Sequence, residues 1–303
     1  MGDARRAVRF RVIPDEEGMT LRVLLSRRLG ITKDEASALV KSGGVYVNKL
    51  RVRLASVRVA PGERVTAYPE TATVTALDPA SIRIVHRDPS FLVVDKDPGV
   101  PVTPTREASV GSLSDALIKR LQSEGVRRPY VGAVHRLDQP ASGLVIFTIR
   151  GVANQSVHKQ FREHQIRRIY RVEVQGEAPD TCTVEAALTD SRGAKVRVAE
   201  GGEPGALSAT THFARLARRE GRDLLRAELE TGRTHQIRVH AAHMGWPVVG
   251  DFRYGPDAQG GGAKRPLHLH AHELEFEHPT RGESVRVVSE LPSWARHDGD
   301  GPA

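Results

Sequence analysis

Residues 131–147 have the sequence Val131-Gly132-Ala133-Val134-His135-Arg136-Leu137-Asp138-Gln139-Pro140-Ala141-Ser142-Gly143-Leu144-Val145-Ile146-Phe147. An apolar run leads into a charged turn and a second apolar run follows, which predicts a strand, a loop and another strand. Asp138 is therefore expected at the point where a strand gives way to a loop. A rigid scaffold can present a carboxylate to a substrate from such a place. The charged residues of this turn would equally fit a solvated loop.

The composition excludes several classes of protein. The chain has 303 residues, 39% of them hydrophobic and 27% charged, as is typical of a soluble globular protein that can form two domains. No apolar run reaches the roughly 20 residues of a membrane span. The charged N-terminus lacks the apolar core of a signal peptide, so a cytoplasmic location is expected. The single cysteine, Cys182, excludes an internal disulfide framework and a multi-cysteine zinc site.

The charge balance favours a polyanionic partner. The chain has 45 Lys and Arg against 37 Asp and Glu, and its pI is about 9.9. Nucleic acid is the commonest partner of so basic a chain.

Residues 15–68 form a predicted small domain with two helices and short strands. Leucines recur at helical spacing over 19–29, and Gly30 follows them as a stop. Thr32 and Glu35 have the spacing of a capping box that begins a second helix. Strands are predicted at 45–49 and 64–68. This domain is rich in cations that suit an RNA phosphate backbone, although a solvated helix face has the same pattern; those we expect to contact RNA are Arg22, Arg27, Arg28, Lys33, Lys41 and Lys49.

The small domain resembles the S-four-type RNA-binding domain. The resemblance lies in Gly43-Gly44-Val45-Tyr46-Val47-Asn48-Lys49 and in Pro61-Gly62-Glu63-Arg64-Val65. The chain departs from the family at Thr32-Lys33, where serine and arginine are usual, but a cation is retained. The resemblance implies that the domain binds RNA.

A linker is predicted at 69–81, a large domain at 82–292 and a tail at 293–303. Apolar and polar residues alternate at 169–175 and 224–230, and long helical patterns are few. This pattern favours an α+β domain on a mostly antiparallel or mixed sheet, flanked by helices and loops.

Four segments of the large domain resemble, in order, the RluA-type pseudouridine synthases, which isomerise uridine in structured RNA. They are Phe91-Leu92-Val93-Val94-Asp95-Lys96-Asp97-Pro98-Gly99-Val100, His135-Arg136-Leu137-Asp138 with Ser142-Gly143, Arg168-Ile169-Tyr170-Arg171-Val172, and Leu229-Glu230-Thr231-Gly232-Arg233-Thr234-His235-Gln236-Ile237-Arg238-Val239-His240. Three positions depart from the family pattern: Asp97, Thr103 and Ala141. None of them removes a group that the chemistry needs.

The resemblance implies a catalytic carboxylate at Asp138 that pairs with Arg238, and Tyr170 packing on the target base. It also implies that Arg136 fills the space left by a flipped base, that His135 orders the loop and that both contact RNA, as does Arg233. Thr234 and Gly245 are good helix-capping residues, so a helix is predicted at 234–244. Arg233 and Arg238 would then face different directions, because five residues are not a whole number of turns.

Isomerisation of uridine breaks a sugar–nitrogen bond and forms a sugar–carbon bond, with no redox change. A carboxylate can act there as a nucleophile or stabilise developing positive charge, so no cofactor is expected. The histidines at 268, 270 and 272 alternate on a predicted strand, but no ligand partner lies at metal-site spacing, and no metal is expected.

The sequence therefore predicts a monomeric, cytoplasmic RNA pseudouridine synthase whose substrate is large-subunit (23S-type) ribosomal RNA or its precursor. Three alternatives remain open. They are the same chemistry on transfer RNA, a noncatalytic RNA-binding or ribosome-assembly protein, and a glycosidase-like hydrolase, for which no second carboxylate stands in a comparable motif.

Overall fold

A computed structural model describes residues 7–69, 76–105, 111–189, 195–256 and 266–300. The chain forms two compact units, each described by itself. We call Gly2–Ser81 with Thr103–Arg127 the small unit, and Ile82–Val102 with Arg128–Ala303 the large unit. Residues 103–127 thus group with the small unit, although they lie within the segment predicted as the large domain. Residues 70–75 of the predicted linker lie outside the described residues.

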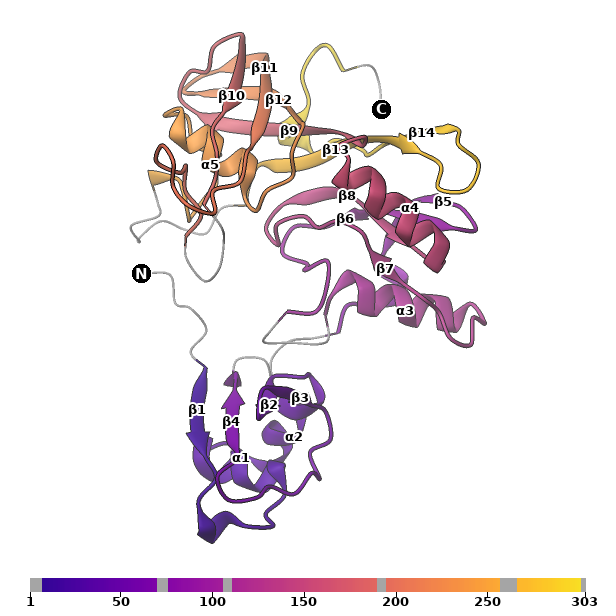
Figure 1. Cartoon of the computed structure of the whole chain (residues 1–303). Helices are drawn as coiled ribbons and strands as arrows, with labels where there is room; N and C mark the ends of the chain where they lie inside the picture. The colour runs from indigo at the N-terminus through magenta and orange to yellow at the C-terminus, as the bar shows by residue number, and fades with distance from the viewer. Residues whose placement is uncertain (1–6, 70–75, 106–110, 190–194, 257–265, 301–303) are drawn as a thin grey trace. The chain divides into compact units, whose positions relative to one another are not determined.

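The small unit has a four-stranded antiparallel sheet in the order β1-β4-β2-β3 (Figure 1). Its strands are β1 (Val8–Arg11), β2 (Val45–Val47), β3 (Leu50–Val52) and β4 (Arg64–Ala67). Strand β1 precedes the predicted start of the domain at residue 15 and pairs along β4. The helices are α1 (Leu21–Leu29), α2 (Lys33–Lys41) and α3 (Leu113–Ser123), with 3-10 turns η1 (Pro14–Glu16) and η3 (Pro79–Ser81).

The ends of α1 and α2 follow the predicted capping. Gly30 ends α1 in the left-handed conformation with φ of 67°, which glycine adopts without a Cβ penalty. Thr32 and Glu35 form the predicted capping box, since each side chain accepts the backbone N–H of the other. Buried leucines and valines of both helices form one core with the sheet.

The large unit is built on a ten-stranded mixed sheet whose main path is β10-β11-β12-β9-β13-β8-β6-β5 (Figure 1). Strands β14 and β7 pair with β13 and β8 off this path. The strands are β5 (Arg83–Arg87), β6 (Phe91–Lys96), β7 (Gly132–Ala133), β8 (Ser142–Thr148), β9 (Arg167–Gln175), β10 (Thr181–Glu185), β11 (Thr210–Arg219), β12 (Arg222–Leu229), β13 (Leu269–Glu277) and β14 (Ser284–Val288). Among these described strands, only β8 and β13 pair in parallel. The predicted α+β class with a mostly antiparallel sheet is confirmed.

The parallel pairing of β8 with β13 fixes where the 134–141 loop enters the sheet. Gly143 lies opposite Ala271 with φ of 106°. A Cβ at Gly143 would lie 2.2 Å from the carbonyl oxygen of Ala271, so this close approach requires glycine. The loop that carries Asp138 is thereby held at the middle of the sheet.

Two helices cover parts of this sheet. Helix α4 (Gly151–Arg162) buries Val157 in a core that includes Phe91, Leu144 and Ile146. Helix α5 (Gln236–His243) buries Val239 in a second core. None of the described helices combines the length and apolar character that a membrane crossing requires.

Part of the predicted tail packs against other segments of the large unit, to which it belongs. It contains the 3-10 turn η5 (Ser293–Ala295). The Trp294 ring stacks on His268 with 4.6 Å between ring centroids. Asp300 accepts a hydrogen bond from Arg171 at 2.5 Å.

Candidate active site

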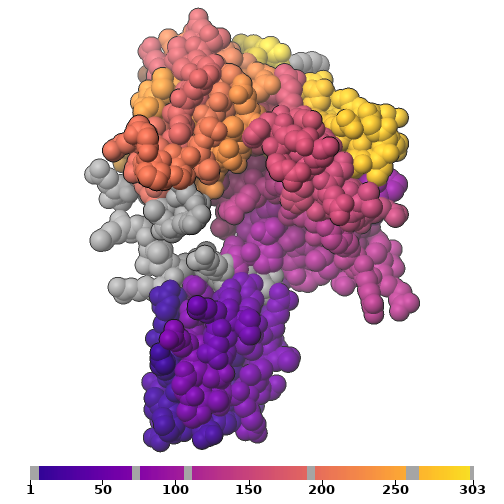
Figure 2. Space-filling model, in the orientation of Figure 1, coloured from indigo at the N-terminus to yellow at the C-terminus, as the bar shows by residue number. Residues whose placement is uncertain are grey.

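The large unit contains a cavity of about 520 Å³ beside the 134–141 loop. That loop lines it together with the C-terminal end of α4, the start of β9 and the segment that joins β12 to α5. In the space-filling view, the magenta surface around α4 and the orange surface around α5 lie on either side of a recess (Figure 2). Segments far apart in sequence therefore meet at one hollow.

Asp138 lies in this cavity and contacts Arg238. Its Oδ2 accepts a hydrogen bond from Arg238 Nη1 at 2.8 Å, and its side chain is 15% exposed. His235 Nε2 lies 3.7 Å from the other carboxylate oxygen. The predicted contact between Asp138 and Arg238 is present, and the carboxylate remains accessible from the cavity.

A second carboxylate, to which the sequence analysis gave no role, holds Arg238 from behind. Asp251 accepts from Arg238 Nε at 2.7 Å and from Nη2 at 2.8 Å, and its side chain is fully buried. Burial alone would raise the pKa of Asp251, but the hydrogen bonds from Arg238 and from two backbone N–H groups lower it below its usual value. The opposing carboxylates outweigh the burial of Arg238 and raise its pKa, so Arg238 stays charged.

The predicted helix start at Thr234 is wrong by two residues. Helix α5 begins at Gln236, and His235 precedes it with φ of 58°. The side-chain amide oxygen of Gln236 accepts the backbone N–H of Arg233 at 3.0 Å and so fixes the segment before the helix, and no described side chain caps the first turn of α5. Arg233 lines the cavity but donates its Nε to the carbonyl oxygen of Ser208. Arg233 and Arg238 therefore face different partners, as predicted.

Tyr170 lies on β9, is 7% exposed and lines the cavity. Burial raises the pKa of its phenol, and the neighbouring Asp138 carboxylate adds to the rise against the opposing effect of Arg168. A neutral phenol at physiological pH is a packing surface and a proton donor rather than a base. This environment fits the predicted stacking better than proton removal.

His135 and Arg136 differ in their surroundings. His135 Nε2 accepts the backbone N–H of Ile146 at 2.9 Å, and its ring stacks on Phe161. Burial, assisted by Arg168, lowers the pKa of His135 to about 3, so the ring is neutral and fastens the loop to β8. Arg136 is exposed at the cavity, with no hydrogen bond or ion pair among the described residues. Arg136 is therefore available to a ligand, whereas His135 is occupied by the protein.

Lys96 supports the same loop, and the sequence analysis gave it no role. It is fully buried, and its Nζ donates to the carbonyl oxygens of Asp97, Val100 and Gln139 at 3.0, 2.9 and 3.0 Å. Burial lowers the pKa of the Lys96 ammonium to about 8 against the opposing effect of Asp138. Because Gln139 follows Asp138, Lys96 ties the Asp138 loop to the turn after β6.

Replacing Lys96 with methionine is expected to lower the free energy of unfolding by about 3 kcal/mol, because three carbonyl groups lose the hydrogen bonds that the buried ammonium donates. Urea unfolding measures this loss. The control is Lys119→Met, which removes an exposed pair with Asp115 and is expected to cost less than about 0.5 kcal/mol. Equal losses in the two variants would contradict the role given to Lys96.

The predicted RNA-binding cations of the small unit are not equivalent. Most of them are exposed, with side chains that form no hydrogen bond or ion pair among the described residues, namely Arg22, Arg27, Lys33, Lys41 and Lys49. Arg28 instead donates to Glu16 from Nε at 2.6 Å and from Nη2 at 3.0 Å. Glu16 is buried, so Arg28 neutralises it, and Arg28 has less unpaired charge to offer RNA than the other predicted cations.

The histidines at 268, 270 and 272 do not form a metal site among the described residues. His268 Nδ1 pairs with Glu173, and His270 hydrogen-bonds to the hydroxyl groups of Ser142 and Ser289. Within the described part of the chain, no group of three His, Cys, Asp or Glu could hold a metal ion. The alternating histidines thus form hydrogen bonds with neighbouring side chains, and His270 and His272 both contact the hydroxyl group of Ser289.

The chain matches two family models. Residues 90–243 match the RNA pseudouridylate synthase model, and residues 19–65 match the S4 domain. The first match contains Asp138, Tyr170 and Arg238.

Curated relatives align along most of the chain. An uncharacterized RNA pseudouridine synthase of Bacillus subtilis, YlyB, is 34% identical over 86% of this chain and 86% of its own length. The ribosomal large subunit pseudouridine synthase C of Yersinia pestis is 33% identical over 93% of this chain and 92% of its own length. Among solved structures, human RNA pseudouridylate synthase domain containing 4 has a TM-score of 0.59 at 22% identity. It covers 70% of this chain and 89% of its own, and this likeness shows the fold.

Proposed function

This chain belongs to the RNA pseudouridylate synthase family and is an RNA pseudouridine synthase, and from that premise we propose that it acts on large-subunit ribosomal RNA through Asp138 and a flipped-out uridine. The observation that supports the site most strongly is the chain of contacts from Asp138 through Arg238 to the buried Asp251. It puts one accessible carboxylate in a cavity and fixes its orientation.

Asp138 is proposed as the reacting group. A carboxylate that accepts a hydrogen bond from a fixed guanidinium keeps its orientation as water leaves the cavity. In that state it can attack the nucleotide or stabilise positive charge that develops on the sugar when the bond to nitrogen breaks. The freed uracil then rotates and bonds to the sugar through carbon five, whose hydrogen leaves as a proton while the former glycosidic nitrogen takes up a proton. The product is therefore an isomer of the substrate, and no cofactor is consumed.

Base flipping is proposed because a uridine that is stacked or paired in folded RNA cannot reach Asp138 inside the cavity. Tyr170 offers a buried aromatic face beside that carboxylate on which the extruded base can stack. Arg136 is the exposed cation of the same loop, and it can occupy the space that the base leaves and contact phosphate.

Large-subunit ribosomal RNA is the proposed substrate because the Yersinia pestis relative, which aligns over most of both chains, is named for that subunit. The S4 domain is consistent with a structured RNA. The test maps pseudouridines in ribosomal and transfer RNA from cells that lack this protein and from the parent strain. Loss of sites in large-subunit RNA supports the proposal, and loss confined to transfer RNA overturns the substrate.

Replacing Arg22 and Arg27 together with glutamine is expected to weaken RNA binding, because the small unit loses two exposed cations that can neutralise phosphates. The slope of log affinity against log salt should fall by about 0.7–0.9 for each phosphate that is no longer neutralised. Binding titrations at several KCl concentrations measure the slope. Arg197→Gln is the control, because Arg197 is paired with Glu203 in the large unit. An unchanged slope in the double variant would count against this surface.

A further inference from the structure

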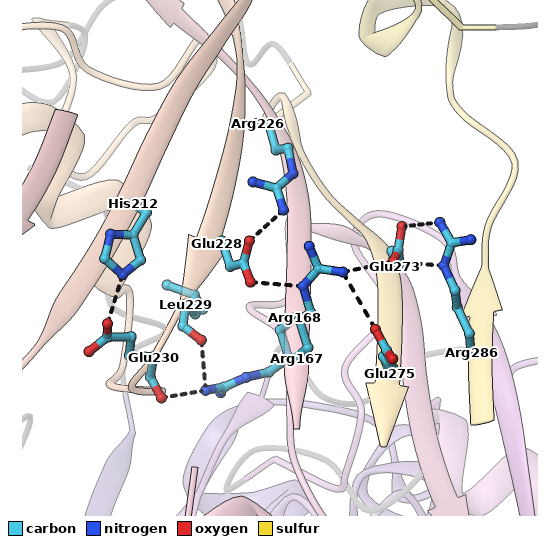
Figure 3. Close-up of polar contacts among 10 residues, drawn as sticks. All are labelled: Arg167, Arg168, His212, Arg226, Glu228, Leu229, Glu230, Glu273, Glu275 and Arg286. Atoms are coloured by element: carbon cyan, nitrogen blue, oxygen red, sulfur yellow. Dashed lines mark hydrogen bonds and ion pairs between the residues drawn. The ribbon is translucent and has the colours of Figure 1, made fainter. Parts of the chain in front are cut away.

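Two consecutive arginines on β9 have opposite surroundings. Arg167 is on the outer face of the sheet, donates to Glu228 and Glu275 at 2.9 and 3.4 Å, and lies 3.6 Å from Glu273 (Figure 3). Arg168 points the other way, toward the face of β9 that carries Tyr170, and it lines the cavity. Side chains alternate along a strand, so adjacent arginines face different environments.

Arg168 is a buried guanidinium without a carboxylate partner among the described residues. Only 6% of the residue is exposed. Its Nη2 donates to the carbonyl oxygens of Leu229 and Glu230 at 3.4 and 3.1 Å (Figure 3), and its Cζ lies 5.7 Å from the centre of the Phe161 ring. Its Nε is buried with no hydrogen-bond partner, and its Nη1 makes no hydrogen bond within the described part of the chain. Burial lowers the pKa of Arg168, whereas the buried Arg238, which has two carboxylates, has a raised pKa.

Gly232 packs directly against the unused end of this guanidinium. A Cβ at Gly232 would lie 2.5 Å from Arg168 Nη1, which is closer than real Cβ contacts. Gly232 and Arg168 both line the cavity. The backbone of Gly232 is not in the left-handed region, so the requirement at this position is space next to Nη1.

An unpaired buried charge is costly, and proteins normally match it with an opposite charge or a full set of hydrogen bonds. Two carbonyl groups satisfy one end of Arg168 and leave its positive charge unneutralised. The anions that an RNA substrate brings are its phosphates, and guanidinium groups bind phosphate oxygens strongly. We propose that Arg168 binds a backbone phosphate of the RNA next to the target uridine, through the Nη1 end that has no partner among the described residues and that the absence of a Cβ at Gly232 allows into this position.

This inference rests on the proposed function, because it concerns the cavity that receives the uridine, but it does not depend on which RNA is modified. The probe is therefore total RNA from cells that lack this protein, labelled with tritium at carbon five of uracil. Such RNA contains the target whatever its class. Tritium release gives kcat, KM and the salt dependence of kcat/KM for each full-length variant.

The first variants are Arg168→Gln and the matched control Arg167→Gln. Arg168→Gln is expected to raise KM about tenfold, as expected for loss of one charged hydrogen bond, with kcat little changed. The slope of log kcat/KM against log KCl should fall by about 0.7–0.9, which corresponds to one phosphate. Arg168→Lys retains the charge and should keep the slope of the unsubstituted enzyme. Arg167→Gln should also leave the slope unchanged, because Arg167 is on the opposite face.

Gly232→Ala supplies a second test if loss of the bonds to Leu229 and Glu230 prevents Arg168→Gln from folding. The added Cβ displaces Nη1 while the charge and the rest of the chain stay, so KM should rise and the slope should fall as in Arg168→Gln. A salt slope that stays unchanged in the folded variants overturns the proposal, whatever happens to kcat. A fall in kcat or thermal stability with an unchanged slope would show that Arg168 only supports the two carbonyl groups. Failure of the proposed catalytic site is detected by a separate measurement. It would appear as tritium release by Asp138→Asn that equals release by the unsubstituted enzyme.

Discussion

Asp138→Asn is expected to abolish pseudouridine formation, with a fall in the rate constant of about 10⁴-fold or more, the range seen when a nucleophile is removed from an enzyme. Asparagine has nearly the same shape but brings no negative charge to the reacting nucleotide. It can still accept a hydrogen bond from Arg238 Nη1, which contacts Asp138 at 2.8 Å. Tritium release from RNA labelled at carbon five of uracil measures the loss.

Two controls separate this loss from damage to the fold. Thermal unfolding should change little, because Arg238 retains both hydrogen bonds to Asp251. Affinity for unmodified RNA should also be retained, because Arg136 and the cations of the small unit are untouched. Undiminished tritium release from the variant would refute the catalytic role, and release of free uracil by the unsubstituted enzyme would indicate a hydrolase.

Arg238→Met is expected to have the second largest effect, on stability as well as activity. It leaves the fully buried Asp251 without its cation, and removal of one partner from a buried ion pair costs about 3–5 kcal/mol. Activity should fall about 100-fold or more, because Asp138 loses the guanidinium that orients it. Urea unfolding and tritium release measure the two effects.

The stability loss in Arg238→Met should depend on pH. Arg238 holds the pKa of Asp251 below its unfolded value. The stabilisation from this pair is therefore complete above the ordinary aspartate pKa, near 4, and disappears as pH falls through the lower pKa of the folded state. Unfolding at pH 7 should show the full loss, and unfolding near pH 3 a smaller one. A loss independent of pH would contradict the ion-pair explanation.

The double variant Arg238→Met with Asp251→Asn separates the two roles of the arginine. Asparagine removes the uncompensated charge, so most of the stability should return. Activity should stay low, since Asp138 still lacks its partner. Recovery of activity along with stability would mean that Arg238 acts on the fold alone.

The local patterns of the sequence predicted most of the elements. The capping box at Thr32 and Glu35, the stop at Gly30 and the strand–loop–strand around Asp138 are present because hydrogen bonds and dihedral angles within a few residues decide them. The start of α5 was predicted incorrectly. The Gln236 side chain accepts the backbone N–H of Arg233, and His235 adopts a positive φ. Neither feature has a strong signature in a single sequence.

The motifs of the sequence also indicated which side chains belong to one site, through their resemblance to a family. They did not show what supports those side chains. Lys96 contacts Gln139 and Arg238 contacts Asp251, and local sequence gives no role to Lys96, Gln139 or Asp251. Likewise, Arg28 fits the cationic pattern of the small unit, but in the structure its guanidinium pairs with the buried Glu16.

By itself, the sequence determined the α+β class, the family and the chemical type of the site, because these follow from periodicity and from motifs that are read along the chain. Tertiary structure alone decided which charges are neutralised and which remain available. Asp138 and Arg238 are 100 residues apart, and the neighbours Arg167 and Arg168 differ only in the face of β9 that each occupies. Burial and partners set the state of a charge, and folding brings those partners from distant parts of the chain.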